Sequence, residues 1–550
     1  MRQRVLIIGL DGFTWRTGKY LIDENIMPHL GQLTRRGSHG ELMSVLPFET
    51  CPAWTSFQTG CRPGKTGVFA FHTYDRRSGA MRINSAAECH VPTLWEIADA
   101  AGKTAISINM PVSHPAPKIE RGAIVPGLLC FELSSNTVHP PEVFEKFVAP
   151  VKGYRIVNMD EAQTLEDFVD WQIEVESRRG ILARNMMQAY DWDLCCVQMQ
   201  STDHFQHGHW WTMDRQAHGF EEQAHQDVLR FYRAVDDSIG MILEGIDDQT
   251  TVFVVSDHGF CPIRCYFCIN TWLKRHGFLT VIPQEPEDAP HSASVKGMVK
   301  LKDKLKETLW PVKKAAQAYG AVKDAIWQAI PKKTEPLFCE KDLGHLRTKI
   351  DYEASQAFSL GAMAGMIYLI GPESQRQELA GEISGRLMAE YGPDSENDII
   401  KSVRPGGEHY GDDPDITARP DLVVELAPGV VTVLDPYRPN DLVEKYFTCA
   451  YYREKQHGTH EPEGALVMAG PGVKQGGQID GELIDIMPTA LALLGVAVPD
   501  HLDGKVLTDA FDVAPQWQTQ SMSLGRKSSH AHSDQEQAQV EKHLSDLGYL

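Results

Sequence analysis

The sequence has no long apolar run. None of its apolar stretches approaches the ~20 residues that a membrane-spanning helix needs, so we expect no membrane span. The first apolar run, at 5–9, is short and leads into Asp11-Gly12 without a small-residue cleavage site. We therefore do not expect a signal peptide either.

Positive net charge and a disulfide framework are also missing. The formal net charge is −21, and binding to a phosphate backbone needs a basic face, so we expect no nucleic-acid polymer as a partner. The 11 cysteines are an odd number, and some are adjacent, such as Cys195 and Cys196. This usage suits a reducing compartment, so we expect a cytoplasmic protein.

What the chain does contain is a series of strand-like apolar runs that alternate with helical patterns. Between the runs, Val228, Val235, Ile239 and Ile242 keep the spacing of one helix face. Strands that alternate with helices predict an α/β fold with a mostly parallel central sheet flanked by helices. The runs that we expect to form strands are residues 5–9, 104–109, 123–126, 194–199, 251–255, 366–370, 422–426 and 465–469.

One segment interrupts this alternation. Residues 281–348 open with three prolines and continue with helical apolar spacing, and ten lysines stand against three acids between 296 and 333. A solvated helical insertion explains this pattern, with a basic cap over an anionic substrate or a membrane-surface helix as alternatives. We expect three parts: an α/β domain of residues 1–280 and 349–512, a basic helical insertion at 281–348, and a polar linker with a terminal helix at 513–550.

The first strand and the helix that follows it carry a candidate anion site. Asp11 comes at the carboxyl end of the first apolar run, where open α/β sheets bind ligands. Thr50 stands just before Pro52, which favours a helix start there. Because a helix N-terminus attracts anions, a hydroxyl beside it with a carboxylate nearby suggests phosphoryl chemistry. On these residues alone, a helix N-cap at Thr50 and a turn residue at Asp11 explain the pattern equally well.

Three further clusters of Asp and His fall at strand ends or sharp turns. Asp203 and His207 follow one strand and are four residues apart, so one helical turn places them on the same face. Asp257-His258 follows another strand. The third cluster runs from 457 to 464. Asp and His without cysteine partners are the ligands of divalent ions at open, catalytic sites.

Together and in this order, the motifs resemble the alkaline phosphatase superfamily and, within it, the type I phosphodiesterase/nucleotide pyrophosphatase family. The resemblance covers most of the chain. It is carried by Gly-Leu-Asp-Gly at 9–12, Thr-Cys-Pro-Ala-Trp at 50–54, Thr-Gly at 59–60 with Pro-Gly at 63–64, the segment 203–207, Ser-Asp-His-Gly-Phe at 256–260, Ile-Asn-Thr-Trp-Leu at 269–273, Gly-Thr-His at 458–460 with Pro-Glu-Gly at 462–464, Gly-Pro-Gly at 470–472, Asp-Ile-Met-Pro-Thr at 485–489 and Leu-Gly-Tyr-Leu at 547–550.

The resemblance implies a site for two divalent metal ions, with zinc as the expected metal and manganese or iron as alternatives. The residues implied to hold one metal are Asp11, Thr50, Asp257 and His258. Those implied to hold the other are Asp203, His207 and a histidine of the third cluster. His460 matches the family's Gly-Thr-His form and is preferred, with His457 as the alternative.

The resemblance also implies a reaction. Thr50 is the expected nucleophile, which attacks phosphorus in line and forms a phosphothreonine that water then hydrolyses. The expected partner is a small phosphate ester, cleaved by a phosphodiesterase or nucleotide-pyrophosphatase-like hydrolase. The alternatives are a phosphomonoesterase or phosphotransferase of the same superfamily, or a non-catalytic binding relative. The last is disfavoured because all seven metal positions are filled.

Two features depart from related patterns. The Cys-x-Pro-x-Arg pattern of sulfatases is absent, although Cys51 follows Thr50. Where nucleotide pyrophosphatases carry an asparagine after the nucleophile helix, this chain has Phe71, which weakens any assignment of a nucleotide substrate. The candidates for contacting the phosphate are instead Lys65, His72 and Asn109, each of which a structural role explains as well.

Overall fold

The computed structural model separates the chain into two compact units. The first is Met1–Leu279 with Gln356–Leu550, and the second is Thr280–Ser355. In the second unit, Val281 and Ile350 form an antiparallel bridge. The residues that the structure describes are 3–76, 79–130, 132–157, 162, 164–215, 220–282, 350–361, 363–411, 413, 416–434, 443–445 and 457–522.

Two predicted segments fall largely outside these ranges. The basic helical insertion at 281–348 is described only at its first two residues, and the terminal helix lies wholly beyond the described part. The three-part division of the chain therefore stays a prediction. In the described ranges, no helix has the length and apolar character needed to cross a membrane. The expected cytoplasmic location also stays a prediction.

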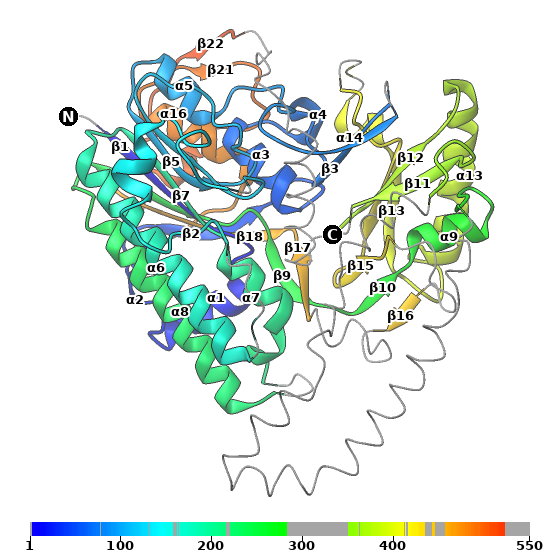
Figure 1. Cartoon of the computed structure of the whole chain (residues 1–550), viewed down its shortest axis with the longest axis horizontal. Helices are drawn as coiled ribbons and strands as arrows, with labels where there is room; N and C mark the ends of the chain where they lie inside the picture. The colour runs from blue at the N-terminus through cyan, green and yellow to red at the C-terminus, as the bar shows by residue number, and fades with distance from the viewer. Residues whose placement is uncertain are drawn as a thin grey trace, which may run out of the picture. The chain divides into compact units, whose positions relative to one another are not determined.

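The first unit is built on a large, mostly parallel sheet (Figure 1). Its strand order is β19 (Gly477–Gln478), β2 (Ser38–Met43), β18 (Glu463–Ala469), β8 (Thr250–Val255), β1 (Arg4–Leu10), β7 (Leu194–Met199), β5 (Ala105–Met110) and β6 (Gly122–Pro126), with β20 (Gly481–Glu482) also paired to β2. The five strands from β8 to β6 run parallel, and β18 is antiparallel to both of its neighbours. The predicted fold class is confirmed.

Both faces of this sheet are buried, which is why its strands are continuous apolar runs rather than alternating ones. In β1, Leu6, Ile8 and Leu10 belong to one hydrophobic core, whereas Val5 and Ile7 belong to the other. Figure 1 shows one set of helices on each face. One set contains α1 (Trp15–Asp23), α2 (Pro28–Arg36), α6 (Leu165–Ala189) and α8 (Glu222–Leu243); the other contains α3 (Thr50–Thr59), α5 (Leu94–Ala100) and α16 (Ile486–Leu493).

A second, antiparallel sheet contains two of the predicted strands. Its order is β11 (Ala357–Leu360), β12 (Gly365–Leu369), β14 (Leu422–Leu426) and β13 (Ile400–Pro405). The runs predicted at 366–370 and 422–426 therefore form strands, but not in the parallel sheet. A short buried run has the same appearance in either kind of sheet, and only its partners decide which one it joins.

Apart from α13 (Glu373–Tyr391), the remaining elements are short. The short helices are α4 (Pro63–Thr66), η1 (Phe144–Val148), α7 (Ser201–His209), η2 (Trp210–Thr212), α9 (Ile269–Arg275), α14 (Gly406–Tyr410), η3 (Leu483–Asp485) and η4 (Thr508–Ala510). The strands are β3 (His72–Asp75), β4 (Ala80–Ile83), β9 (Gly259–Pro262), β10 (Cys265–Phe267), β15 (Val430–Thr432), β16 (Val443–Lys445), β17 (Gly458–Glu461), β21 (Val498–Pro499) and β22 (Thr519–Gln520).

Candidate active site

The candidate site lies where three neighbouring parallel strands end. Strand β1 pairs with β8 on one side and β7 on the other, so their carboxyl ends lie next to one another. Asp11 follows β1, Asp257 and His258 follow β8, and Asp203 lies on α7, which begins just after β7. All four side chains are buried, with exposed fractions of 0%. The topology thus brings the candidate metal ligands to the edge at which open α/β sheets bind their ligands.

The turn after β1 depends on a glycine. Gly12 has a φ of +67°, a left-handed conformation that glycine adopts without strain. Its backbone N–H donates to Asp257 Oδ1 over 3.1 Å. A Cβ at this position would lie 2.7 Å from the Phe260 ring, which is closer than van der Waals contact allows. Gly12 therefore lets the chain turn tightly enough for Asp11 and Asp257 to meet.

Helix α7 brings two more candidate ligands to this turn. Asp203 and His207 share one helix face, with Asp203 Oδ1 3.5 Å from His207 Nε2. Two other side chains of the helix hold the turn after β1: the Thr202 hydroxyl donates to the Asp11 carbonyl over 2.6 Å, and Gln206 Nε2 donates to the Gly12 carbonyl over 2.7 Å. The helix is thereby fastened to the segment that carries Asp11.

The two-stranded antiparallel sheet of β9 and β17 brings in His460. Antiparallel pairing places His460 opposite Phe260. His460 Nε2 lies 3.1 Å from Asp203 Oδ1 and 2.9 Å from His207 Nε2, and its Nδ1 lies 3.0 Å from the Phe48 carbonyl. Its ring also stacks on that of His258, with centroids 3.6 Å apart. His460 is thus held in contact with the Asp and His side chains of two other segments and with the Phe48 carbonyl of a third.

These side chains form two groups with the character of metal sites. Asp11, Asp257 and His258 make up one group; Asp203, His258 and His460 make up the other, and within each group the ligand atoms lie within 4.8 Å of one another. Several buried atoms make no hydrogen bond in the described part of the chain, namely Asp11 Oδ1, Thr50 Oγ1, Asp257 Oδ2 and His258 Nε2, although the last two lie 3.2 Å apart. Buried polar atoms without partners are costly, so their convergence fits a pair of divalent cations.

The electrostatics of the site agree with this fit. Burial raises the pKa of Asp11 well above its ordinary value, and the nearby carboxylates of Asp257 and Asp203 raise it further. Burial also raises the pKa of Asp257, with Asp203 adding to the shift. Burial likewise lowers the pKa of His258 well below its usual range and that of His207 to about 4. Anionic carboxylates that are destabilised by one another, beside neutral imidazoles, are what a dication stabilises.

Asp203 differs from the other two carboxyls. Burial raises its pKa, but the opposing effect of His207, His460 and His258 is larger and holds the pKa below the ordinary value. Asp203 is therefore the carboxylate that most readily carries its charge in this cluster.

Thr50 is the first residue of α3, and it is fully buried. Glu49 occupies the N-cap position, so the interpretation of Thr50 as a mere cap is wrong. The first helical hydrogen bond is donated by the Ala53 N–H to the Glu49 carbonyl, which leaves the N–H groups of Thr50 and Cys51 outside the helical ladder. One turn later, Trp54 Nε1 donates to Asp11 Oδ2 over 2.7 Å, which ties this helix to the end of β1.

The sequence profile of the Type I phosphodiesterase / nucleotide pyrophosphatase family matches residues 5–370, more than half of the chain. The chain belongs to this family. The resemblance carried by the motifs, including the placement in the alkaline phosphatase superfamily, is thereby confirmed. Family membership and the two buried Asp/His groups together identify a metal-dependent phosphoesterase-like hydrolase. No curated protein matches the chain significantly.

Two solved structures share the fold of this phosphodiesterase-family chain. Both are phosphonoacetate hydrolase from Sinorhizobium meliloti 1021, one in complex with phosphonoformate and the other with phosphonoacetate. The TM-scores are 0.54 and 0.52 at 13% and 12% identity, and each match covers 90% of this chain and 96% of the other. At this identity the likeness concerns the fold alone.

Not every predicted site residue enters the two ligand groups. The backbone N–H of His457 donates to the His207 carbonyl over 2.7 Å, and the His457 ring lies 6.2 Å from that of Trp211. The structure thus places His460, rather than His457, among the groups. His207 belongs to neither group, although it contacts Asp203 and His460 of the second.

The three candidate substrate contacts lie in different surroundings. Lys65 Nζ lies 2.6 Å from both Asp503 Oδ1 and the His501 carbonyl, so its ammonium is directed to that segment. His72 lies on β3, paired with Ile83 of β4. Asn109 Nδ2 donates to Gln198 Oε1 over 2.7 Å. The substrate-contacting roles of all three stay predictions.

Several residues around the site escaped the sequence analysis. Gln198 is the clearest, because a polar side chain within the otherwise apolar strand β7 is a signal that the sequence does contain. The contacts of Trp54, Thr202 and Gln206 could not be predicted, although Trp54 and Gln206 stand in the motifs at 50–54 and 203–207, because these contacts depend on segments far away in the chain.

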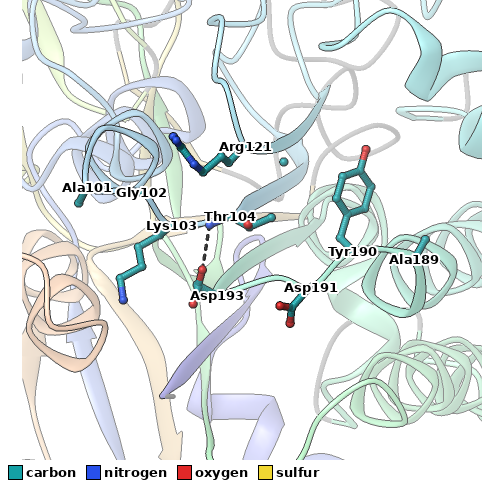
Figure 2. Close-up of a pocket in the computed structure, with 10 residues that line it drawn as sticks. Ala101, Gly102, Lys103, Thr104, Arg121, Ala189, Tyr190, Asp191 and Asp193 are labelled. Atoms are coloured by element: carbon teal, nitrogen blue, oxygen red, sulfur yellow. Dashed lines mark hydrogen bonds between the residues drawn. The ribbon is translucent and has the colours of Figure 1, made fainter. Parts of the chain in front are cut away.

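A surface hollow of about 600 Å³ lies at the amino ends of β5, β6 and β7, on the opposite edge of the same sheet (Figure 2). Lys103 and Thr104 precede β5, Asp193 precedes β7, and Arg121 precedes β6. The Asp193 carboxylate accepts a hydrogen bond from the Thr104 N–H, which Figure 2 marks. This hollow therefore lies at the amino ends of the strands, away from the Asp and His groups.

Proposed function

We propose that the protein is a two-metal phosphodiesterase that hydrolyses small phosphate esters through a phosphothreonine on Thr50. The observation that carries this proposal is the position of Thr50: a buried hydroxyl at the start of α3, on a helix that Trp54 ties to Asp11. Thr50 Oγ1 has no hydrogen-bond partner among the described residues, as is also true of Asp11 Oδ1 and Asp257 Oδ2.

The chain's own residues would hold the two ions. Thr50, Asp11, Asp257 and His258 would hold one. Asp203, His207 and His460 would hold the other. When bound, two divalent ions supply Lewis-acid stabilisation of charge on the phosphoryl, attacking and leaving oxygens. Carboxylate and imidazole ligands suit zinc, with manganese or iron as alternatives.

In the proposed reaction, Thr50 Oγ attacks phosphorus, the bond to the leaving-group oxygen breaks, and the hydroxyl proton passes to solvent. Negative charge on the phosphoryl oxygens is favoured near the start of α3, where the N–H groups of Thr50 and Cys51 lie outside the helical ladder. Water then cleaves the phosphothreonine and restores Thr50. Burial of the Asp and His side chains strengthens each electrostatic contact.

Comparing two substrates tests the reaction class. The metal-loaded protein is expected to have a higher kcat/KM for bis-p-nitrophenyl phosphate than for p-nitrophenyl phosphate. The reverse preference would identify a phosphomonoesterase, and transfer of the phosphoryl group to an added alcohol would identify a phosphotransferase. No turnover of either, with two metals bound, would identify a binding relative.

A matched pair of variants tests the nucleophile. Thr50→Ala is expected to lose turnover by at least about 10³-fold, in line with removal of other covalent nucleophiles, while it keeps most of its metal. Thr55→Ala is the control, because Thr55 lies on the same helix, is equally buried and also has an Oγ1 without a described hydrogen-bond partner. If Thr50→Ala were as active as a Thr55→Ala variant that works at the wild-type rate, Thr50 would not be the nucleophile.

A further inference from the structure

The two carboxylate oxygens of Asp11 have different surroundings. Oδ2 accepts hydrogen bonds from Trp54 Nε1 over 2.7 Å and from Gln198 Nε2 over 2.8 Å. Oδ1 has no hydrogen-bond partner in the described chain and lies 3.6 Å from His258 Nε2. We infer that Trp54 and Gln198 are positioning residues, which hold the Asp11 carboxylate so that only Oδ1 faces the metal. This inference rests on the proposed metal site.

The sheet itself explains how both donors reach one oxygen. Gly9 lies on β1, two residues before Asp11, and is paired with Gln198 of β7. A Cβ on Gly9 would lie only 2.4 Å from the Trp54 ring. The missing side chain at Gly9 therefore makes the space in which the Trp54 indole crosses the strand and reaches Asp11.

The orientation of the Gln198 amide is set from its other side. Gln198 Oε1 accepts a hydrogen bond from Asn109 Nδ2 over 2.7 Å, so the Gln198 NH₂ group must point the other way. That NH₂ group donates to Asp11 and also to Gln200 Oε1 over 2.8 Å. Asn109 of β5, Gln198 of β7 and Asp11, directly after β1, thus form one buried polar chain.

Asn109 is held in an unusual backbone conformation. Its φ is +61°, in the left-handed region, where the register of β5 against β6 shifts between Ile108 and Met110. Asparagine enters this region more readily than most residues other than glycine. The bulge thereby directs the Asn109 amide at Gln198, and strain of this kind is more common at functional sites than elsewhere.

The chemical consequence concerns how Asp11 binds a metal. With both lone pairs of Oδ2 occupied by donors, Asp11 offers one oxygen rather than two. Hydrogen-bonded partners of metal ligands commonly change metal affinity by about 10- to 100-fold. We therefore expect loss of either donor to weaken one of the two metal equivalents by a factor of that size and to leave the other nearly unchanged.

Two pairs of variants test this expectation by metal binding rather than by activity. Trp54→Phe removes the indole N–H, and Trp95→Phe is its control. Trp95 belongs to the same hydrophobic core, is 1% exposed and has an Nε1 without a described hydrogen-bond partner. Gln198→Met is matched by Gln172→Met, since Gln172 is also buried, at 3% exposed, but lies on α6. For each, Zn²⁺ dissociation constants are measured by chelator competition and bound metal by mass spectrometry.

The expected result is weaker binding of one Zn²⁺ equivalent in Trp54→Phe and Gln198→Met, and wild-type binding in both controls. Urea unfolding of the metal-free proteins should show that both tryptophan variants fold, with Trp54→Phe the less stable of the two because only Trp54 loses a hydrogen bond. If Trp54→Phe or Gln198→Met fails to fold, the metal binding of the other of these two variants decides.

Unchanged Zn²⁺ affinity in Trp54→Phe and Gln198→Met, or an equal loss in the controls, would overturn the inference and leave the proposed function intact. A wild-type protein that binds no divalent metal would overturn both.

Discussion

The buried ion pair between Glu176 and Arg179 supports the helix that carries Asp203 and His207. Both side chains are 0% exposed, and Arg179 Nη1 lies 3.1 Å from each Glu176 oxygen. Glu176 Oε1 also accepts a hydrogen bond from the Ser201 N–H, at the start of α7, over 3.0 Å. We predict that Glu176→Gln destabilises the protein strongly and loosens α7.

The size of the expected stability loss follows from the burial of this ion pair. Removing one partner of a buried pair leaves the other charge uncompensated, which costs about 3–5 kcal/mol. Arg179 keeps its hydrogen bonds to the Arg155 and Ile156 carbonyls, so part of its charge stays solvated by the backbone. We therefore expect a loss near the lower end, about 3 kcal/mol, which is a large part of the ~5–15 kcal/mol that stabilises a typical domain.

The same helix provides a control of matched chemistry. Arg178 and Glu174 also form an ion pair on α6, at 3.0 Å, but their side chains are 35% and 54% exposed. A pair of this kind contributes only about 0.3–0.5 kcal/mol, so Glu174→Gln should be close to wild type. Urea unfolding followed by circular dichroism measures both variants.

A Glu176→Gln variant no less stable than Glu174→Gln would refute the argument. A Glu176→Leu/Arg179→Met double variant gives a second check. Because it removes both charges, it should be more stable than Glu176→Gln.

Three further predictions concern the site. Gly12→Ala should lower stability by about 1–3 kcal/mol and weaken metal binding, because the new Cβ meets Phe260 and φ is positive; wild-type metal affinity and unfolding would contradict this. Chelator treatment should lower the unfolding midpoint, because Asp11 and Asp257 then face each other without a cation; calorimetry with and without metal checks it. Burial lowers the pKa of His209 to about 4, below its unfolded value of about 6.5. The unfolded chain therefore binds more protons between these values, and metal-free stability should fall as pH drops from about 6.5 to 4; His209→Phe should show a shallower fall.

Local sequence patterns were enough to predict the strands and to find where along the chain the candidate site residues stand. Each of the eight predicted runs forms a strand, because a buried strand needs a short apolar run whatever its partners are. Asp11, Asp203 and Asp257 were recognised at strand ends, and the resemblance implied that they meet. The structure brings them to one edge of the sheet because β1, β7 and β8 are neighbouring parallel strands. The periodicity of apolar residues and the order of the motifs along the chain are enough for predictions of this kind.

Contacts between distant segments, by contrast, could be known only from the tertiary structure. The pairing of β9 with β17 decides that His460 lies among the ligand groups, whereas His457 lies beside Trp211. The same holds for the antiparallel sheet that takes up β12 and β14, and for the bonds from Trp54 and Gln198 to Asp11. These depend on which faces pack together, and a buried residue has the same local sequence pattern whichever partner it meets.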